Sequence, residues 1–182
     1  RCLPDRGLAF AKIAGALLLG YLLWALGTLG LVPNGRGAAA LALVLLVGGA
    51  LILFRRLGPR SMAFLRRERR TLLLYEAVFL VAFVGWTLVR SYNPEIEGTE
   101  KPMDFALLNT AVRSEFFPPA DPWLSGHPVN YYYFGYVMLA GVTQLSGEVP
   151  AVAFNLGLAT LFAATTVGAW GLGMNLARLH LS

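Results

Sequence analysis

Long apolar stretches separated by short polar segments set the pattern of this chain. A hydrocarbon core about 30 Å thick takes roughly 20 apolar residues in a helix, and several stretches here meet or approach that length. The pattern predicts an all-α fold, a polytopic transmembrane bundle with about five membrane helices in one integral membrane region over 1–182. The predicted spans cover residues 8–32, 38–54, 71–89, 131–146 and 151–177.

Composition supports a membrane protein, because 57% of the residues are hydrophobic and 14% are charged, far from the usage of soluble domains. We expect the lipid bilayer of the plasma membrane as a partner, no nucleic acid, and an oligomeric state that the sequence leaves open. The chain opens with Arg1 rather than Met and stops at Ser182 just after an apolar run. We therefore expect the amino-terminal part of a longer protein.

Charge predicts the orientation in the membrane. The segment 55–70, RRLGPRSMAFLRRERR, holds seven arginines and the single acid Glu68. Loops rich in arginine face the cytoplasm, so this segment is predicted to be cytoplasmic. Its charge also suits anionic lipid headgroups, although topology alone explains it. The span 71–89 then leads outward and delivers the loop 91–130 to the extracytoplasmic face.

Glu76 lies inside the predicted span 71–89. A carboxylate in hydrocarbon is costly and is a functional candidate by default, but this one lies close to the arginine cluster. We expect it to reach the headgroup layer or to pair with Arg69 or Arg70, as a structural anchor.

The first half of the loop 91–130 predicts a short surface helix. Pro102 suits the first turn of a helix, and good helix formers follow it in MDFALLNTAVR. Asp104 falls in that first turn, where the helix dipole favours an ionised carboxylate. Asp104 is therefore a candidate catalytic base, with Glu100 four residues before it. Phe105, Leu108 and Val112 share one face, the pattern of a helix that lies along a membrane.

Two other interpretations of the acidic residues in this loop remain open, metal binding and simple solvation. Glu95 and Glu97 lie upstream of Glu100 and Asp104. Two carboxylates that converge in space could hold a divalent cation through oxygen ligands. Equally, acids in a surface loop are often only solvated.

The second half, FFPPADPWLSGHPVNYYYFGY, holds four prolines and two glycines and predicts an extended, shaped surface. Aromatic residues at the headgroup level are common in membrane proteins. Three successive tyrosines point in different directions on a helix, so at least one hydroxyl could face a polar cavity or a phosphate. The candidate substrate contacts are Asp121, Trp123, His127, Asn130, Tyr131, Tyr132 and Tyr133, with Arg113 as a phosphate partner.

Three blocks of this region carry a family resemblance. EKPMDFALLNTAVRS, FFPPADPWLSG and NYYYFGY resemble the signature blocks of the YYY-motif family, a group of uncharacterised prokaryotic multi-pass membrane proteins. The upstream stretch LPDRGLAFAKIAGALLLGYLLWALGTLG resembles the amino-terminal region of the same family. That family in turn is similar to the C-type glycosyltransferases of the GT-C fold, which use lipid-phosphate-linked sugars and carry an acidic residue in their first large extracytoplasmic loop.

The resemblance implies a GT-C-like membrane glycosyltransferase with a polyprenyl-phosphate-linked sugar donor at the extracytoplasmic face. It implies Asp104 as the catalytic residue, Glu100 as the nearest alternative, and Asp121 as a metal or substrate contact. Asp104 and Asp121 are the candidate ligands of a Mg²⁺ or Mn²⁺ cofactor. The chain departs from many such enzymes, because EKPMD replaces adjacent Asp and Glu and two additional helices precede the loop-bearing hairpin.

A non-enzymatic membrane protein is the alternative, either a transporter module or a scaffold subunit. In that case the loop 91–130 caps the helices and its aromatic residues anchor it in the membrane. Charges along an intramembrane path would favour transport, and Glu76 is the acid that the spans offer. The sequence leaves open whether the chain is an enzyme.

Overall fold

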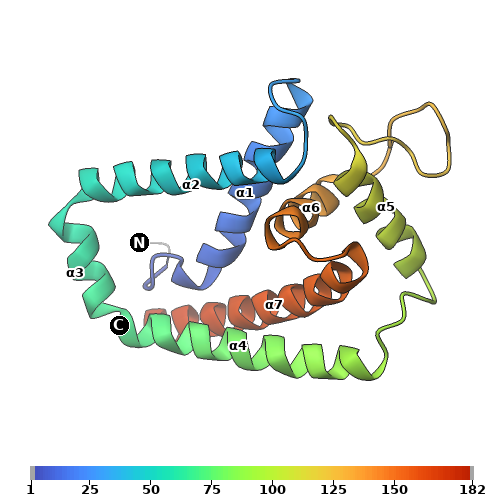
Figure 1. The fold of residues 1–182 in the computed structure, drawn as a ribbon. Coiled ribbons are helices and arrows are strands. Elements are labelled where there is room, and N and C mark those ends of the chain that lie inside the picture. The colour runs from blue at the N-terminus through green and yellow to red at the C-terminus, as the bar shows by residue number, and fades with distance from the viewer. Residues whose placement is uncertain (1–2, 181–182) are drawn as a thin grey trace. The chain divides into compact units, whose positions relative to one another are not determined.

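The computed structural model describes residues 3–180, apart from the side chain of Arg60. Within this range the fold is helical and contains no strand, with one isolated bridge between Ala120 and Pro128 (Figure 1). The elements are a 3₁₀ turn η1 (Leu8–Phe10) and the helices α1 (Ala11–Thr28), α2 (Arg36–Leu57), α3 (Pro59–Arg67), α4 (Arg69–Tyr92), α5 (Lys101–Arg113), α6 (Phe134–Ser146) and α7 (Pro150–His180).

Four segments of the described chain are long and apolar enough to cross a membrane. They are Leu8–Thr28, Arg36–Leu57, Arg69–Tyr92 and Pro150–His180. They correspond to the predicted spans 8–32, 38–54, 71–89 and 151–177. The prediction of a polytopic helical membrane protein is therefore confirmed.

The predicted span 131–146 is shorter in the structure. Helix α6 begins only at Phe134 and has 13 residues, which at 1.5 Å per residue is about 20 Å. A bilayer core is about 30 Å thick, so α6 is too short to cross it as a regular helix. Gly147 adopts a left-handed conformation, φ 75°, and ends the helix. The predicted span included Tyr131 and Tyr132, but the backbone is not helical at these two residues.

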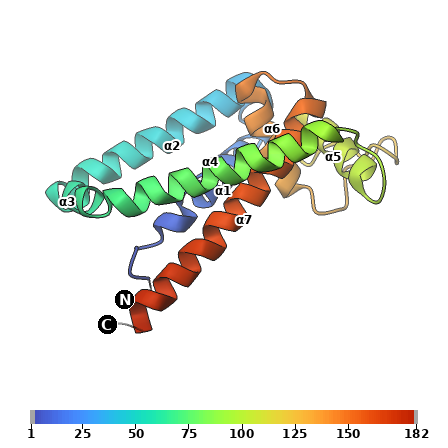
Figure 2. The same cartoon turned by 90° about the horizontal axis from the view of Figure 1, so that it is seen from below.

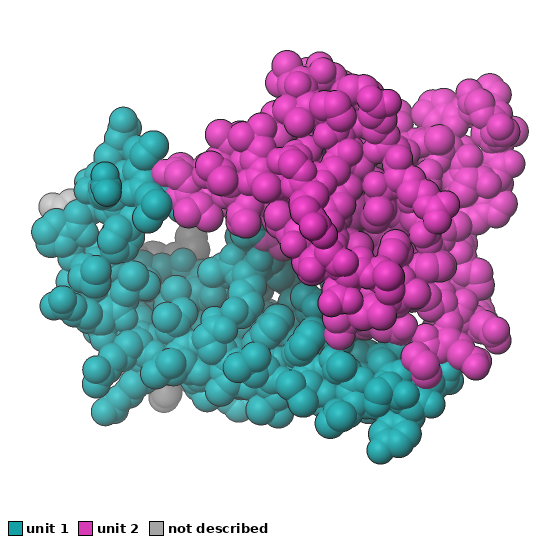
Figure 3. Space-filling view, viewed as in Figure 1, with its two compact units in different colours: residues 1–15, 50–93, 158–182 teal, residues 16–49, 94–157 magenta. Residues whose placement is uncertain are grey.

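The chain packs as two compact units (Figure 3). Unit 1 comprises residues 1–15, 50–93 and 158–182, and unit 2 comprises 16–49 and 94–157. Helices α1, α2 and α7 each contribute residues to both units.

In unit 1, α4 and α7 run antiparallel. Near the end of α7, Arg178 Nη2 donates a hydrogen bond to Thr71 Oγ1 in the first turn of α4, at 3.1 Å. Farther along, Trp86 of α4 stacks on Phe162 of α7, with ring centroids 4.5 Å apart. The start of α4 and the end of α7 therefore lie at the same end of unit 1.

A buried carboxylate binds the amino-terminal segment to the same end of unit 1. Asp5 is 1% exposed and accepts hydrogen bonds from the Gly7 N–H at 2.9 Å, the Tyr75 hydroxyl at 3.0 Å and the Ala9 N–H at 3.3 Å. Its own N–H donates to Asn175 Oδ1 at 3.0 Å. Burial alone would raise the pKa of Asp5, but these hydrogen bonds outweigh burial and hold that pKa below its usual range.

Glu76 has a different partner from the one that we expected. Its Oε2 accepts a hydrogen bond from Lys12 Nζ at 2.7 Å, and the ammonium also lies 4.9 Å from the centre of the Phe79 ring. The anchoring role is retained, but the pair joins α4 to α1 and does not involve Arg69 or Arg70. The cause is tertiary, because Lys12 lies 64 residues away in the sequence.

In unit 2, the predicted surface helix is present as α5, with Pro102 in its first turn. Its apolar face packs against protein. Leu108 is fully buried, and the Phe105 ring meets Phe154 edge to face, with centroids 5.8 Å apart. The face that we expected to lie along the membrane surface therefore forms part of the core of unit 2.

The turn between α1 and α2 and the helix α6 bind the carboxyl end of α5. Asn34 Nδ2 donates to the carbonyls of Ala111 at 2.9 Å and Ser114 at 2.8 Å. Gln144 Nε2 of α6 donates to Asn34 Oδ1 at 3.1 Å and to the Val112 carbonyl at 3.3 Å. The last carbonyls of a helix lack partners within the helix, so these contacts fix where α5 ends.

Candidate functional site

Asp104 is a half-buried carboxylate in the first turn of α5. Its Oδ1 accepts a hydrogen bond of 2.6 Å from the hydroxyl of Tyr136 on α6. Its Oδ2 has no hydrogen-bond partner among the described residues. Burial, and then the neighbouring Asp104, raise the pKa of Tyr136, so this tyrosine stays a proton donor at neutral pH. The hydrogen bond to Oδ1 thus orients Asp104, and its Oδ2 remains without a hydrogen bond from the described residues.

Glu100 lies next to Asp104 in the chain fold, as the sequence suggested. It is the residue before the first turn of α5, and its backbone carbonyl accepts the Asp104 N–H at 2.9 Å. The Glu100 side chain is exposed and has no hydrogen bond or ion pair within 3–180. The two carboxylates share one end of α5.

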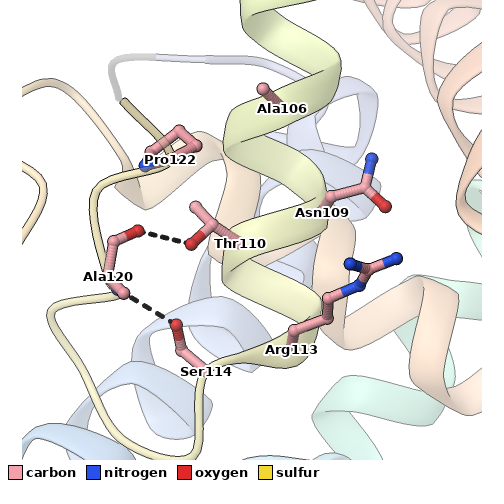
Figure 4. A pocket seen from close by; sticks show the side chains of 7 residues that line it. All are labelled: Ala106, Asn109, Thr110, Arg113, Ser114, Ala120 and Pro122. Carbon is pink, nitrogen blue, oxygen red and sulfur yellow. Dashed lines mark hydrogen bonds between the residues drawn. The ribbon is translucent and has the colours of Figure 1, made fainter. Parts of the chain in front are cut away.

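A hollow of about 390 Å³ lies between α5 and the proline-rich loop (Figure 4). The loop is held against the helix because Thr110 Oγ1 donates to the Ala120 carbonyl, and the Ala120 N–H donates to Ser114 Oγ at 3.1 Å. Arg113 is the cation at its rim, is exposed, and makes no ion pair with a described residue. The full lining is Ala106, Asn109, Thr110, Arg113, Ser114, Ala120 and Pro122.

Asp104 and Arg113 lie on different faces of α5. Residues three or four apart share a helix face, so Asn109 and Arg113 form one row along the hollow. Asp104 instead aligns with Leu108, which is buried in unit 2. The structure therefore does not bring the candidate base and the candidate phosphate partner together.

Asp121 shapes the tip of the proline-rich loop. Its Oδ1 accepts the N–H groups of Trp123 at 2.8 Å and Leu124 at 2.9 Å. The hydrogen bond from Leu124, and then the one from Trp123, hold the pKa of Asp121 below its usual range. The Asp121 N–H donates to the His127 carbonyl at 2.8 Å and closes the turn. Trp123 at the tip is 62% exposed.

His127 and Asn130 are both exposed. In the part of the chain that the structure describes, no three His, Cys, Asp or Glu side chains gather as a metal-binding group. The metal candidates Asp104 and Asp121 therefore do not belong to such a group of three among the described residues.

The three successive tyrosines divide between two environments. Tyr133 accepts a hydrogen bond of 3.0 Å from Trp24 Nε1 of α1. The rings of Tyr131 and Tyr132 meet at 5.3 Å between centroids and are 52% and 87% exposed.

Tyr136 is the site residue that sequence reasoning missed. It belongs to the same YYYFGY block, one turn after Tyr133, but we singled out only the triplet. The available signal was its position where the polar loop gives way to an apolar segment of the sequence. Its pairing with Asp104 spans 32 residues, and no local pattern indicates it.

These features define a class, a multi-pass helical membrane protein with a folded segment between its third and fourth candidate spans. Residues 18–181 match the family described as Uncharacterized membrane protein (DUF2298), and the chain belongs to this family. No curated protein and no solved structure matches the chain. Membership agrees with the predicted multi-pass membrane family and with the bilayer as a partner.

Proposed function

We propose that this protein is a membrane glycosyltransferase that takes its sugar from a polyprenyl-phosphate donor at the extracytoplasmic face. The observation that supports this proposal is Asp104, a half-buried carboxylate with one oxygen held by Tyr136 at 2.6 Å and the other open. A positioned carboxylate of this kind can accept a proton from a reacting hydroxyl. The order of EKPMD, a short helix and then DPWLSGHPVNYYYFG resembles the arrangement in C-type glycosyltransferases, and this resemblance adds the reaction class.

In the proposed reaction, an acceptor hydroxyl gives its proton to Asp104 Oδ2 as its oxygen forms a bond to the anomeric carbon. The bond between that carbon and the phosphate oxygen breaks, and the lipid phosphate leaves with the electron pair. Direct displacement inverts the anomeric configuration. Tyr136 keeps the carboxylate oriented, and Glu100 is the alternative base at the same end of α5.

The remaining candidates take supporting roles in this proposal. Tyr131, Tyr132 and Trp123 are exposed aromatic residues that suit a lipid chain at the membrane edge. Asp121 shapes the loop that carries His127 and Asn130, which would contact the sugar or the acceptor. We give Arg113 no step in the transfer, because it lies on another face of α5.

A Mg²⁺ or Mn²⁺ ion fits this site only in part. Mg²⁺ is commonly held by one or two carboxylates with water and substrate phosphates, and Asp121, or Asp104 if Glu100 is the base, supplies one such ligand. Such an ion would neutralise charge on the departing phosphate.

The test is native mass spectrometry of the purified protein with a panel of polyprenyl-phosphate sugars and an acceptor mixture. Wild type is expected to retain a lipid-linked sugar and convert it. Asp104→Asn keeps an oxygen for Tyr136 but cannot take up the proton, so it should bind without conversion, with turnover at least about 100-fold lower. Glu115→Gln, a change at an exposed acid outside the site, is the matched control and should convert normally.

Failure to bind any lipid-linked sugar would remove the enzyme proposal. The alternative is then a scaffold subunit or transporter module. One observation favours it, because the Asp104–Tyr136 bond also ties α5 to α6. In that case Tyr136→Phe, which breaks the tie, should disturb the protein more than Asp104→Asn, which keeps it.

A further inference from the structure

Helix α3 is a short amphipathic helix of unit 1 that connects the candidate spans α2 and α4 (Figures 1 and 2). Only Gly58 separates it from α2, and only Glu68 separates it from α4. Gly58 has a φ of 57°, a conformation that glycine adopts without strain, and Pro59 begins the helix. A helix joined so closely to two candidate membrane spans is expected at the membrane interface.

Two apolar side chains of α3 are left exposed by the other described residues. Met62 and Leu65 are three residues apart, share one face, and are 42% and 36% exposed. Phe64 is covered instead, because the guanidinium of Arg6 lies 4.7 Å from the centre of its ring. An uncovered apolar face beside a polar one is the pattern of a helix that lies in the boundary between headgroups and acyl chains.

The arginines around this helix exceed the acid available to them. Glu68, the one acid of the segment 55–70, already lies 3.3 Å from Arg67 Nε and 3.6 Å from Arg178 Nη1. Five other arginines are exposed, and their guanidinium groups make no ion pair or hydrogen bond with the described residues: Arg55, Arg56, Arg66, Arg69 and Arg70.

We propose that α3 and these five arginines form a binding surface for anionic phospholipid headgroups. Guanidinium groups bind phosphate oxygens through paired hydrogen bonds, and an anionic partner complements the charge that the described residues leave unneutralised on these arginines. Met62 and Leu65 insert into the boundary between the headgroups and the acyl chains, and so keep the guanidinium groups at the level of the phosphates. This surface is independent of the proposed sugar transfer.

The test places the full chain in nanodiscs of equal parts phosphatidylcholine and phosphatidylglycerol. Native mass spectrometry then measures the ratio of the two lipids retained by the protein. Wild type is expected to be enriched in phosphatidylglycerol. Each cation near such a surface contributes about 1 kcal/mol, about fivefold in affinity, so Arg66→Gln with Arg69→Gln and Arg70→Gln should lower the enrichment at least about fivefold.

The matched control replaces the same three arginines with lysine, which keeps the charge and should keep most of the enrichment. Wild type offers a second test if the glutamine variant does not fold. Its enrichment should fall as salt rises from about 0.05 M to about 1 M, because salt screens exposed charges. An enrichment in phosphatidylglycerol that changes neither with salt nor with the glutamine substitutions would overturn the proposal. So would full competition by soluble glycerol phosphate, which would point to a free phosphate ligand.

Discussion

Two carboxylates of this protein show how neighbours decide what an acid can do. Asp5 is 1% exposed, and both of its oxygens accept hydrogen bonds from the chain, so it serves structure. Asp104 is half-buried and binds Tyr136 through Oδ1, and its Oδ2 has no partner among the described residues, so it keeps one oxygen that can accept a hydrogen bond. Sequence reasoning selected Asp104 from its place in a helix turn, but neither the Tyr136 partner nor the burial of Asp5 follows from local pattern.

Tyr136→Phe tests the bond that orients Asp104. A hydrogen bond to a charged group contributes about 1.5–3 kcal/mol, so we expect a loss of this order in the stability of the protein in detergent. Thermal unfolding followed by circular dichroism measures it. Tyr132→Phe is the matched control, because the Tyr132 side chain is 87% exposed and its hydroxyl has no described partner. An equal loss in both variants would contradict the assigned role.

Asp5→Asn tests the buried carboxylate of unit 1. Hydrogen bonds hold the pKa of Asp5 below its usual value when the protein is folded, so its stabilisation is present above about pH 3.9, the ordinary value, and is lost as pH falls through the folded pKa. Wild type should therefore lose stability on acidification. The variant should be less stable at pH 7 and should lose less on acidification from pH 7 to about pH 3. Thermal unfolding across this pH range measures both; parallel curves would refute the role of Asp5.

At the scale of elements, α5 shows what local pattern can and cannot predict. Pro102 and the helix formers after it indicated where the helix begins. Its carboxyl end depends on Asn34, which donates to the Ala111 and Ser114 carbonyls from 77 and 80 residues away. That contact comes from packing and has no signal near α5.

Asn34→Ala should loosen the end of α5. The change leaves two carbonyls without their donor and removes the acceptor of Gln144, and each unsatisfied buried group costs about 1–3 kcal/mol. Amide hydrogen exchange of residues 108–114, read by mass spectrometry, should become faster. Asn130→Ala, a change at an exposed asparagine of the neighbouring loop, should leave that exchange unchanged. Equal exchange in wild type and Asn34→Ala would show that the cap does not hold α5.

Helix α6 shows the limit of reading length from composition. The stretch 131–146 is apolar enough for a span, but the backbone is not helical at Tyr131 or Tyr132. Tyr133 precedes the helix, and its hydroxyl is held by Trp24 of α1. A side-chain contact made across 109 residues accompanies a helix start that hydropathy does not reveal.

At the scale of the whole molecule, the contacts of unit 1 bear on the number of membrane crossings. Arg178 bonds Thr71, and Asp5 bonds Tyr75 and Asn175, so the start of α4 and the end of α7 meet at one end. The chain must therefore leave that end along α4 and return along α7. A further complete crossing by α6 between them would leave the end of α7 on the opposite side.

Cysteine labelling tests this arrangement. In a Cys2→Ser background, Ser61→Cys in α3 and His180→Cys at the end of α7 should react with an impermeant maleimide only after cells are opened, because arginine-rich loops face the cytoplasm. Ser125→Cys in the proline-rich loop should react in intact cells. Labelling of His180→Cys in intact cells, with Ser61→Cys protected, would mean that α6 crosses the membrane.

Amino-acid sequence alone determined the membrane class, four of the apolar spans and the start of α5, because hydrophobic length and helix initiation are properties of neighbouring residues. Tertiary structure decided the partner of Asp104, the binding of Asp5, the end of α5 and the length of α6. These features join side chains far apart in the chain. Their geometry depends on how helices pack, which no local pattern of apolar and polar positions specifies.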